Sequence, residues 1–326
     1  MRHIRPLLQT GPARPDDAVP FGALWFTHVE ILGDTPRVLP VSDLPTGALD
    51  PFSIRSQVPE IMGILNVTPD SFSDGGQHNC VSRAVEHALA MISAGAGVID
   101  VGGESTRPGA FEVEISEEIQ RTVPVIAALR AAGVTTPISI DTRKAPVAKA
   151  AIKAGATMVN DVSGFTFDPA LAPLCADSNV QICVMHSVGL PQDMQDYPNY
   201  SDVVTETFDF LHSRISDLVD IGIAPDKIIA DPGIGFGKTL DHNLALLERI
   251  SLFHALGVPI LLGASRKRFI GTIGNAPDAA DRAPGSIAVA LAAMAQGVQM
   301  VRVHDVAEHA QAIALWRASV ADRPHD

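Results

Sequence analysis

Short apolar runs rich in β-branched residues alternate with helical segments from residue 61 onward, and few folds accommodate this pattern. About eight such pairs fill roughly 265 residues, the usual size of a closed barrel of parallel strands wrapped by helices. The candidate strands are residues 61–65, 97–101, 137–141, 157–161, 180–185, 227–231, 258–263 and 299–303. The candidate helices are residues 79–95, 114–132, 144–154, 168–177, 200–221, 240–255, 280–296 and 307–321. We therefore predict an α/β fold, a (β/α)8 TIM barrel.

The main alternative is an open, doubly wound parallel sheet. Such sheets seldom contain so many strand–helix units in one domain, and no G-x-G-x-x-G motif follows an early strand. Aromatic residues make up only 5% of the chain, and most of its apolar mass is Ala, Val, Ile and Leu, which suits a parallel sheet covered by helices. The barrel is therefore the better prediction.

Residues 1–55 differ from the rest of the chain, because they are rich in Pro and Gly and only weakly patterned. One apolar patch, from Phe21 to Ile31, is compatible with a strand or two. We expect an N-terminal extension over residues 1–55 and a barrel domain over residues 56–326. The pattern leaves open whether the extension packs on the barrel or is partly disordered.

The net charge of −13 argues against binding to nucleic acid or to an anionic membrane surface. The three cysteines show no paired spacing, so we expect neither disulfides nor a zinc site, and a reducing cytoplasm is the expected location. The N-terminus has no apolar segment suited to a signal peptide. The longest apolar run, residues 287–295, is too short to span a bilayer and indicates either a buried helix or a subunit interface.

Polar groups stand at the end of nearly every candidate strand. The carboxyl ends of barrel strands converge at one mouth, where barrel enzymes keep their active sites, so we predict an active site there. The residues at these strand ends are Asn66, Asp70, Asp100, Asp141, Asn160, Asp161, Met185, His186, Asp231, Ser265, Arg266, Lys267, Arg302 and His304, all polar except Met185.

Three of these groups, Asp141, Asn160 and Asp231, follow apolar strands and should be buried. A buried carboxylate needs hydrogen-bond donors, and a heterocycle with an amino group beside a ring N–H offers two. Asn160 can both donate and accept hydrogen bonds, so it could bind the remaining donors and acceptors along that edge of the heterocycle. The alternative is that Asp141 and Asn160 cap helices, and Asp141 with Thr142 makes a good cap pair.

Basic groups stand at the last two strand ends. Residues 263–271 read GASRKRFIG, and Arg302 and His304 share one face of the last strand. Barrels often bind phosphate after strands seven and eight, so these groups, with Asn66 facing them from the first strand, suit a pyrophosphate. The alternative for His304 alone is a core histidine with satisfied hydrogen bonds.

The loops add three signals. Gly102 and Gly103 let the backbone pass close to a ligand, and residues 106–109, TRPG, form a short basic loop. Residues 231–238, DPGIGFGK, are rich in glycine but lack the spacing of a P-loop. Phe72 and Phe236 are aromatic residues in loops and indicate either walls for an aromatic ring or anchors for the loops themselves.

Residues 61–76, IMGILNVTPDSFSDGG, resemble the first signature of the dihydropteroate synthase family. Residues 102–109, 141–164, 231–238 and 263–271, with residues 302–305, also resemble that family and follow its order. The resemblance implies a (β/α)8 barrel, a homodimer, a requirement for Mg²⁺, and a transferase reaction. In that reaction 6-hydroxymethyl-7,8-dihydropterin diphosphate and p-aminobenzoate give 7,8-dihydropteroate and pyrophosphate.

The resemblance also implies roles for individual residues, with Asp141, Lys267, Arg302 and His304 as the catalytic group. Pterin would be held by Asp141, Asn160, Asp231 and Lys267, with Met185 packing on its face. Pyrophosphate would be held by Asn66, Arg302 and His304, with Asn66 near the Mg²⁺. The p-aminobenzoate site, where sulfonamides would compete, would comprise Thr106, Arg107, Pro108, Phe72, Phe236, Ser265 and Lys267.

The implied mechanism is dissociative: pyrophosphate departs from the pterin methylene before the amine attacks, and no nucleophilic side chain is needed. Two rivals are the methyltetrahydrofolate-binding barrels of corrinoid methyltransferases and a catalytically silent pterin-binding paralogue. The first has no use for the basic groups after strands seven and eight. The second should have lost some of the proposed ligand residues, all of which are present here.

Overall fold

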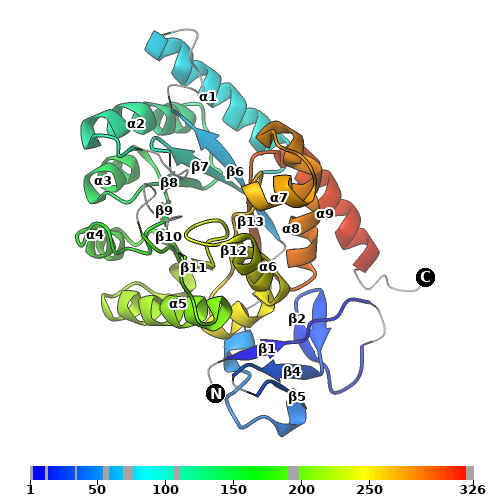
Figure 1. Cartoon of the computed structure of the whole chain (residues 1–326). Coiled ribbons are helices and arrows are strands. Elements are labelled where there is room, and N and C mark those ends of the chain that lie inside the picture. Colours follow the sequence, from blue (N-terminus) through cyan, green and yellow to red (C-terminus); the bar gives the residue numbers. More distant parts are fainter. Residues whose placement is uncertain are drawn as a thin grey trace.

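The computed structural model describes residues 3–11, 14–33, 35–53, 59–68, 76–105, 111–189 and 198–320. Their centre is an eight-stranded parallel sheet with the order β11-β10-β9-β8-β7-β6-β13-β12. An isolated parallel bridge between Ala230 and Ile260 brings the two outer strands together, so the sheet curls into a barrel (Figure 1). The strands are β6 (Glu60–Asn66), β7 (Val98–Gly102), β8 (Ile138–Asp141), β9 (Met158–Asp161), β10 (Gln181–Met185), β11 (Ile228–Asp231), β12 (Leu261–Leu262) and β13 (Met300–Val303).

Helices surround the sheet, which confirms the predicted α/β barrel (Figure 1). They are α1 (Gly76–Ser93), α2 (Ile115–Ala131), α3 (Ala145–Ala154), α4 (Leu171–Ser178), α5 (Val203–Asp220), α6 (Leu240–Glu248), α7 (Arg268–Ile273), α8 (Ala283–Met294) and α9 (Val306–Val320). Three elements differ from the prediction. The strand expected over 258–263 is only two residues long, the helix expected over 240–255 ends at Glu248 and continues as the 3-10 helix η5 (Ile250–Leu256), and the short α7 was not expected.

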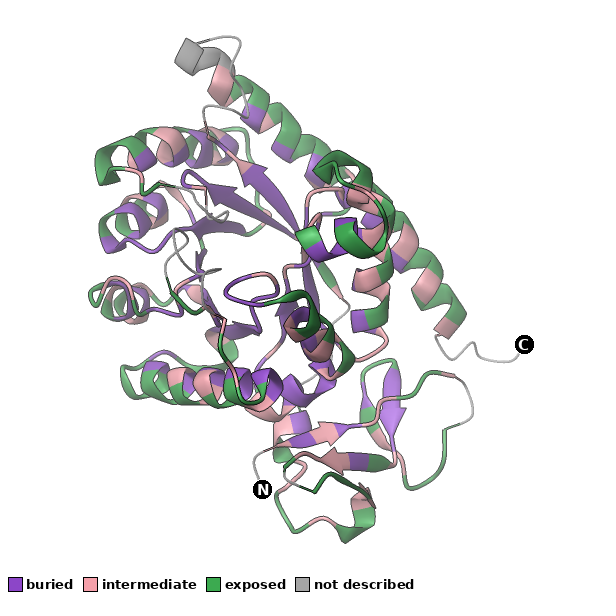
Figure 2. Cartoon of the chain, in the orientation of Figure 1, coloured by how far each residue is buried: buried purple, intermediate pink, exposed green. Residues whose placement is uncertain are grey.

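The barrel interior changes character along the strands. One layer is apolar and packs as a cluster of Met62, Val98, Met158, Cys183, Ile229, Leu261 and Met300. Two residues further along five of these strands, on the same face, stand Asp100, Asn160, Met185, Asp231 and Arg302. The alternate residues face the helices and form the main core, so the strands are buried on both sides (Figure 2). The polar groups are therefore concentrated toward the carboxyl ends of the strands.

The N-terminal extension is largely β-structure. An antiparallel sheet has the order β1-β4-β5, and β2 pairs with β3 in a hairpin. The strand or two expected between Phe21 and Ile31 are confirmed as β3 and β4, but the other strands were missed. The bounds are β1 (Ile4–Pro6), β2 (Val19–Phe21), β3 (Leu24–Phe26), β4 (His28–Ile31) and β5 (Arg37–Pro40), with 3-10 helices η1 (Val41–Asp43) and η2 (Asp50–Ser53). The expected boundary at 55/56 lies outside the described residues.

The extension packs on the barrel beside η5. Arg5 donates from Nε to Ser251 Oγ at 3.2 Å and from Nη2 to the Glu248 carbonyl at 3.0 Å. Ser251 Oγ in turn donates to the Pro6 carbonyl at 3.1 Å. Since η5 leads into the start of β12, the extension covers the end of the barrel opposite the carboxyl ends of the strands (Figure 1).

Candidate active site

Arg302 lies at the centre of the mouth, between carboxylates from two other strands. Its Nε donates to Asp100 Oδ2 at 2.6 Å and its Nη2 donates to Asp141 Oδ2 at 2.8 Å. Asn160 Nδ2 donates to the same oxygen of Asp100 at 3.2 Å. Four strands, β13, β7, β8 and β9, thus contribute to one buried polar cluster.

The charges in this cluster perturb one another. Burial raises the pKa of Asp141 to about 7, although the Arg302 guanidinium opposes the rise. Burial would lower the pKa of Arg302, but Asp100 and Asp141 outweigh it and keep that pKa above its ordinary value. Arg302 is therefore a permanent cation in a pocket where at least one carboxyl can exchange a proton near neutral pH.

Some oxygens of the cluster lack a protein donor. Asp100 Oδ1, Asp141 Oδ1 and Ser139 Oγ are buried and find no hydrogen-bond partner among the described residues. Such atoms are costly unless a ligand or water satisfies them. Asp141 does not cap α3, because the Ala145 N–H at the start of that helix donates to Asp168 Oδ2 instead, at 2.8 Å. The geometry therefore favours the ligand-binding interpretation of Asp141 over helix capping.

Asp231 marks a second part of the mouth, at the end of β11. It is buried, its Oδ1 accepts a hydrogen bond from the Gly233 N–H at 2.7 Å, and burial raises its pKa to about 6. Met185 and Phe236 pack together nearby with Val162. Lys267 Nζ lies 4.0 Å from the centroid of the Phe236 ring. A carboxyl, an apolar wall and a cation thus lie around the same loop.

Ser265 and His304 join the ends of β12 and β13. The Ser265 hydroxyl lies 3.0 Å from His304 Nδ1 and accepts from the His304 N–H at 3.2 Å. Arg266 between Ser265 and Lys267 has a left-handed backbone, with φ of 58°. Its N–H donates to Ser286 Oγ at 2.9 Å and its Nε donates to Asp305 Oδ2 at 3.0 Å, so the unusual turn is held in place.

The structure thus brings most predicted site residues to the carboxyl ends of the strands. Asn66 belongs to this group, because a Cβ placed on Gly102 would lie 3.6 Å from Asn66 Oδ1 and 3.6 Å from Asp141 Cβ. The described members are Asn66, Asp141, Asn160, Met185, Asp231, Phe236, Ser265, Lys267, Arg302 and His304. Phe72, Thr106, Arg107 and Pro108 lie outside the described residues.

Sequence reasoning noticed Asp100 at a strand end but gave it no role. The available signal was its place on the interior face of the strand, two residues before Gly102, but its main partner, Arg302, is distant in the sequence. The buried Lys238, 2.8 Å from His186 Nδ1, was likewise missed. A lysine that closes a glycine-rich loop without the P-loop spacing attracts no attention in a motif search.

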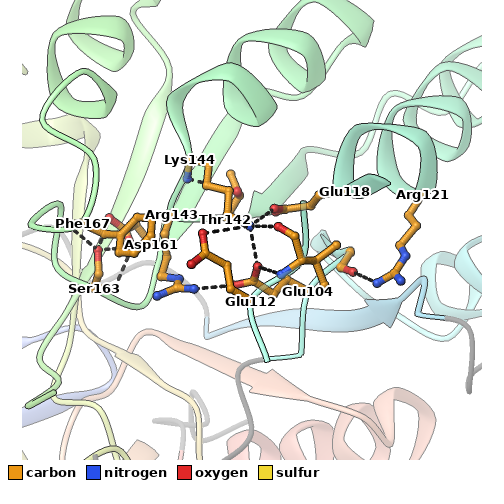
Figure 3. A network of polar contacts seen from close by, with 12 residues as sticks. Glu104, Glu112, Glu118, Arg121, Thr142, Arg143, Lys144, Asp161, Ser163 and Phe167 are labelled. Atoms are coloured by element: carbon orange, nitrogen blue, oxygen red, sulfur yellow. Dashed lines mark hydrogen bonds and ion pairs between the residues drawn. The ribbon is translucent and has the colours of Figure 1, made fainter. Parts of the chain in front are cut away.

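A buried ion network lies beside the mouth, after β7 and β8 (Figure 3). Glu104 accepts from Arg143 Nη2 at 2.6 Å and from Lys144 Nζ at 2.5 Å, and Lys144 also reaches Glu118 at 2.9 Å. The second oxygen of Glu104 accepts from the Val113 N–H at 2.9 Å as well. Glu104, at the start of the basic loop, therefore serves to join β7, α2 and the segment that leads into α3.

Comparison with known proteins places these features in context. The profile of a family described as "Pterin binding enzyme" matches residues 62–304. The curated dihydropteroate synthase of Synechocystis sp. is 47% identical over 261 residues, which cover 79% of this chain and 90% of the relative. The solved dihydropteroate synthase of Yersinia pestis, in complex with a sulfonamide drug, is 46% identical, with 80% of this chain and 94% of that chain covered and a TM-score of 0.75. That of Xanthomonas albilineans, with 4-aminobenzoic acid, is 44% identical, with 80% and 93% covered and the same TM-score.

Proposed function

This chain belongs to the pterin-binding enzyme family, among its dihydropteroate synthases, and from that premise we propose how its residues carry out the reaction. The enzyme is a transferase that joins 6-hydroxymethyl-7,8-dihydropterin diphosphate to p-aminobenzoate and releases pyrophosphate. One observation carries the assignment of roles: buried carboxylates with unsatisfied oxygens surround a permanent cation at the mouth of the barrel.

The pterin binds to Asp141, Asn160, Asp231 and Lys267, with Met185 against its ring face. Asp141 Oδ1 lacks a partner among the described residues, and an amino group beside a ring N–H would supply donors to carboxylates. Asp231 already accepts one backbone hydrogen bond but keeps further acceptor capacity. The apolar contact of Met185 with Phe236 supports a wall for the flat ring system.

The pyrophosphate binds to Asn66, Arg302 and His304. Arg302 remains charged at all relevant pH values, and His304 stands two residues after it, directly beyond the end of β13. The residues also fit Mg²⁺, since Asn66 offers a hard oxygen, and this ion typically takes one or two protein ligands with the rest from phosphate and water. The described residues hold no cluster of three or more Asp, Glu, His or Cys that would form a cage by themselves.

The p-aminobenzoate site comprises Phe236, Ser265 and Lys267 among the described residues. Phe72, Thr106, Arg107 and Pro108 complete it by the family resemblance. Lys267 would contact the second substrate as well as the pterin, because it stands against Phe236 and follows Ser265 by two residues. Sulfonamides would compete at this site.

The reaction is dissociative. The C–O bond between the pterin methylene and the diphosphate breaks, and the electron pair departs with the diphosphate oxygen. The cation that remains is stabilised by the pterin ring, the amine of p-aminobenzoate forms the new C–N bond, and its excess proton is lost. Arg302 and His304 stabilise the negative charge on the leaving group, and bound Mg²⁺ supplies further electrostatic stabilisation of that charge.

We further propose a homodimer in the cytoplasm. The described cysteines Cys80, Cys175 and Cys183 are all free thiols, which suits a reducing compartment. Helix α8 is apolar around its circumference, and Ala288 and Ala292 are exposed while Ile287 and Val289 are only half-buried, which suits a contact between copies. Within the described part of the chain, none of the helices combines the length and apolarity needed to cross a membrane.

The direct test is release of pyrophosphate from 6-hydroxymethyl-7,8-dihydropterin diphosphate with Mg²⁺, in the presence and absence of p-aminobenzoate. We expect release that depends on p-aminobenzoate, with dihydropteroate identified by its mass. Binding of the pterin without any release would instead favour the silent paralogue or the methyltetrahydrofolate-binding relative.

A further inference from the structure

Lys238, the last residue of the glycine-rich loop 231–238, has a buried amino group whose hydrogen-bond partners are all neutral. Its side chain is 3% exposed, and its Nζ donates to the carbonyl oxygens of Gly233 at 2.9 Å and Phe236 at 3.0 Å. Nζ also lies 2.8 Å from His186 Nδ1 and donates to the His186 carbonyl at 3.4 Å. Lys238 appears in none of the ion pairs between described residues. Burying a lysine amino group without a carboxylate in contact is costly, because its charged form loses hydration that no opposite charge replaces, so the arrangement suggests a functional role.

The loop is wrapped around this amino group. Gly233, Gly235 and Gly237 all have a left-handed backbone, with φ of 69°, 80° and 60°. These reversals bring carbonyl groups from two turns of the loop onto one point, the Nζ of Lys238. A Cβ at Gly233 would lie only 1.9 Å from the His186 carbonyl oxygen, so the loop is also pressed against the segment that follows β10.

The same loop carries groups that the proposed function places at the pterin and p-aminobenzoate. The Gly233 N–H orients Asp231 by donating to its Oδ1 at 2.7 Å. Phe236 faces Lys267 and packs on Met185. Lys238 accordingly holds the carbonyls of the same two residues, Gly233 and Phe236, that make these contacts. The orientations of Asp231 and Phe236 therefore both depend on the position of the Lys238 amino group.

On the basis of the proposed function, we propose that Lys238 is a positioning residue of the synthase site, which holds the loop 231–238 against His186 so that Asp231 faces the pterin and Phe236 faces p-aminobenzoate. It acts through these two residues and does not touch substrate. This role differs from that of Lys267, whose ammonium lies in the mouth itself.

The electrostatic surroundings are consistent with this role. Burial lowers the pKa of His186 to about 2, so its ring is neutral and Nδ1 is able to accept from Lys238. Burial also lowers the pKa of Lys238 to about 7, with the nearby Lys267 acting in the same direction and Asp231 opposing. The Tyr200 hydroxyl donates to the Gly237 carbonyl at 3.0 Å and supports the loop from outside.

The test compares Lys238→Met, which keeps the length but removes every donor, with Lys238→Gln, which keeps a donor amide. Lys149→Met on the exposed face of α3 is the matched control. We expect Lys238→Met to weaken binding of 6-hydroxymethylpterin and to raise the KM for p-aminobenzoate, each by at least about tenfold, the scale of one lost buried hydrogen bond. Lys238→Gln should recover part of both losses, and Lys149→Met should change neither.

A second arm separates positioning from a general loss of stability. In a Phe236→Ala background the wall is absent, so Lys238→Met should no longer raise the KM for p-aminobenzoate. The proposal would be overturned if the effects of Lys238→Met and Phe236→Ala on the KM for p-aminobenzoate simply add. It would also be overturned if Lys238→Met binds the pterin and p-aminobenzoate as well as the unmodified enzyme does. If Lys238→Met does not fold, the same comparison with Lys238→Gln decides. Failure of the proposed function would be recognised separately, because the unmodified enzyme would then release no pyrophosphate.

Discussion

In the barrel interior Arg302 donates from Nε to Asp100 Oδ2 at 2.6 Å, and Asp100 is fully buried. The Asp100 carboxylate thus holds the guanidinium at Nε, and Asp141 accepts a second hydrogen bond from Nη2. Since Arg302 is proposed to receive the leaving pyrophosphate, its orientation is set by a residue that no solvent reaches.

Asp100→Asn should therefore lower kcat by about tenfold to a hundredfold, because the amide keeps the shape but loses the charge that aligns Arg302. Steady-state kinetics with both substrates would measure the change. Asp226→Asn, an exposed substitution at the opposite end of β11, should leave kcat unchanged. Full activity in Asp100→Asn would mean that Arg302 is oriented without it.

The pKa of Asp231, raised by burial to about 6, predicts a pH dependence of pterin binding. Only the carboxylate can accept from ring and amino N–H groups with both oxygens. Protonation of Asp231 alone should therefore make the affinity for 6-hydroxymethylpterin about tenfold weaker at pH 5 than well above pH 6, and protonation of Asp141 should add to this loss. Calorimetric titration across this range would show the effect, and Asp231→Asn should abolish the part due to this residue. An affinity that is independent of pH would contradict the assignment.

The same groups affect the stability of the unliganded protein, with a definite sign. The pKa values of Asp231 and Asp141 lie above those of an unfolded chain, at about 6 and about 7, so the folded state binds more protons between pH ~4 and pH ~7. The free energy of unfolding should fall as the pH rises through this window. Urea denaturation at several pH values would test this, and a contribution that increases with pH would argue that other groups dominate.

Lys267→Ala should reduce turnover by at least about a hundredfold, the scale of one lost electrostatic contact in a site that excludes water. The side chain stands 4.0 Å from the Phe236 ring, which is assigned to p-aminobenzoate, and its charge also acts on Asp231, which is assigned to the pterin. Lys149→Ala on the exposed face of α3 provides the comparison. A near-normal rate for Lys267→Ala, measured by pyrophosphate release, would refute its role.

The barrel was predictable because each of its strands is a buried apolar run followed by a polar group, a local pattern. The location of Asp141, Asn160 and Arg302 at one mouth followed from that topology alone. The pairing of Asp100 with Arg302 was not predictable, because it joins strands far apart in sequence and depends on barrel closure. The other strands of the extension, β1, β2 and β5, were missed because they are only three or four residues long, too short for a period to be visible.

The extension provides the last prediction, since it packs far from the carboxyl ends of the strands. Phe21 is 2% exposed, belongs to the small core of the extension, and its ring centroid lies 4.6 Å from that of His254 in η5. Phe21→Ala should lower the free energy of unfolding by about 3–5 kcal/mol, the usual cost of removing a buried phenyl ring. Because this contact lies at the opposite end of the barrel from Arg302, kcat at a temperature where the variant is folded should not change. Val38→Ala, at a side chain that is 55% exposed, should alter neither quantity. A fall in kcat without loss of stability in Phe21→Ala would instead show that the extension acts on the active site through the barrel.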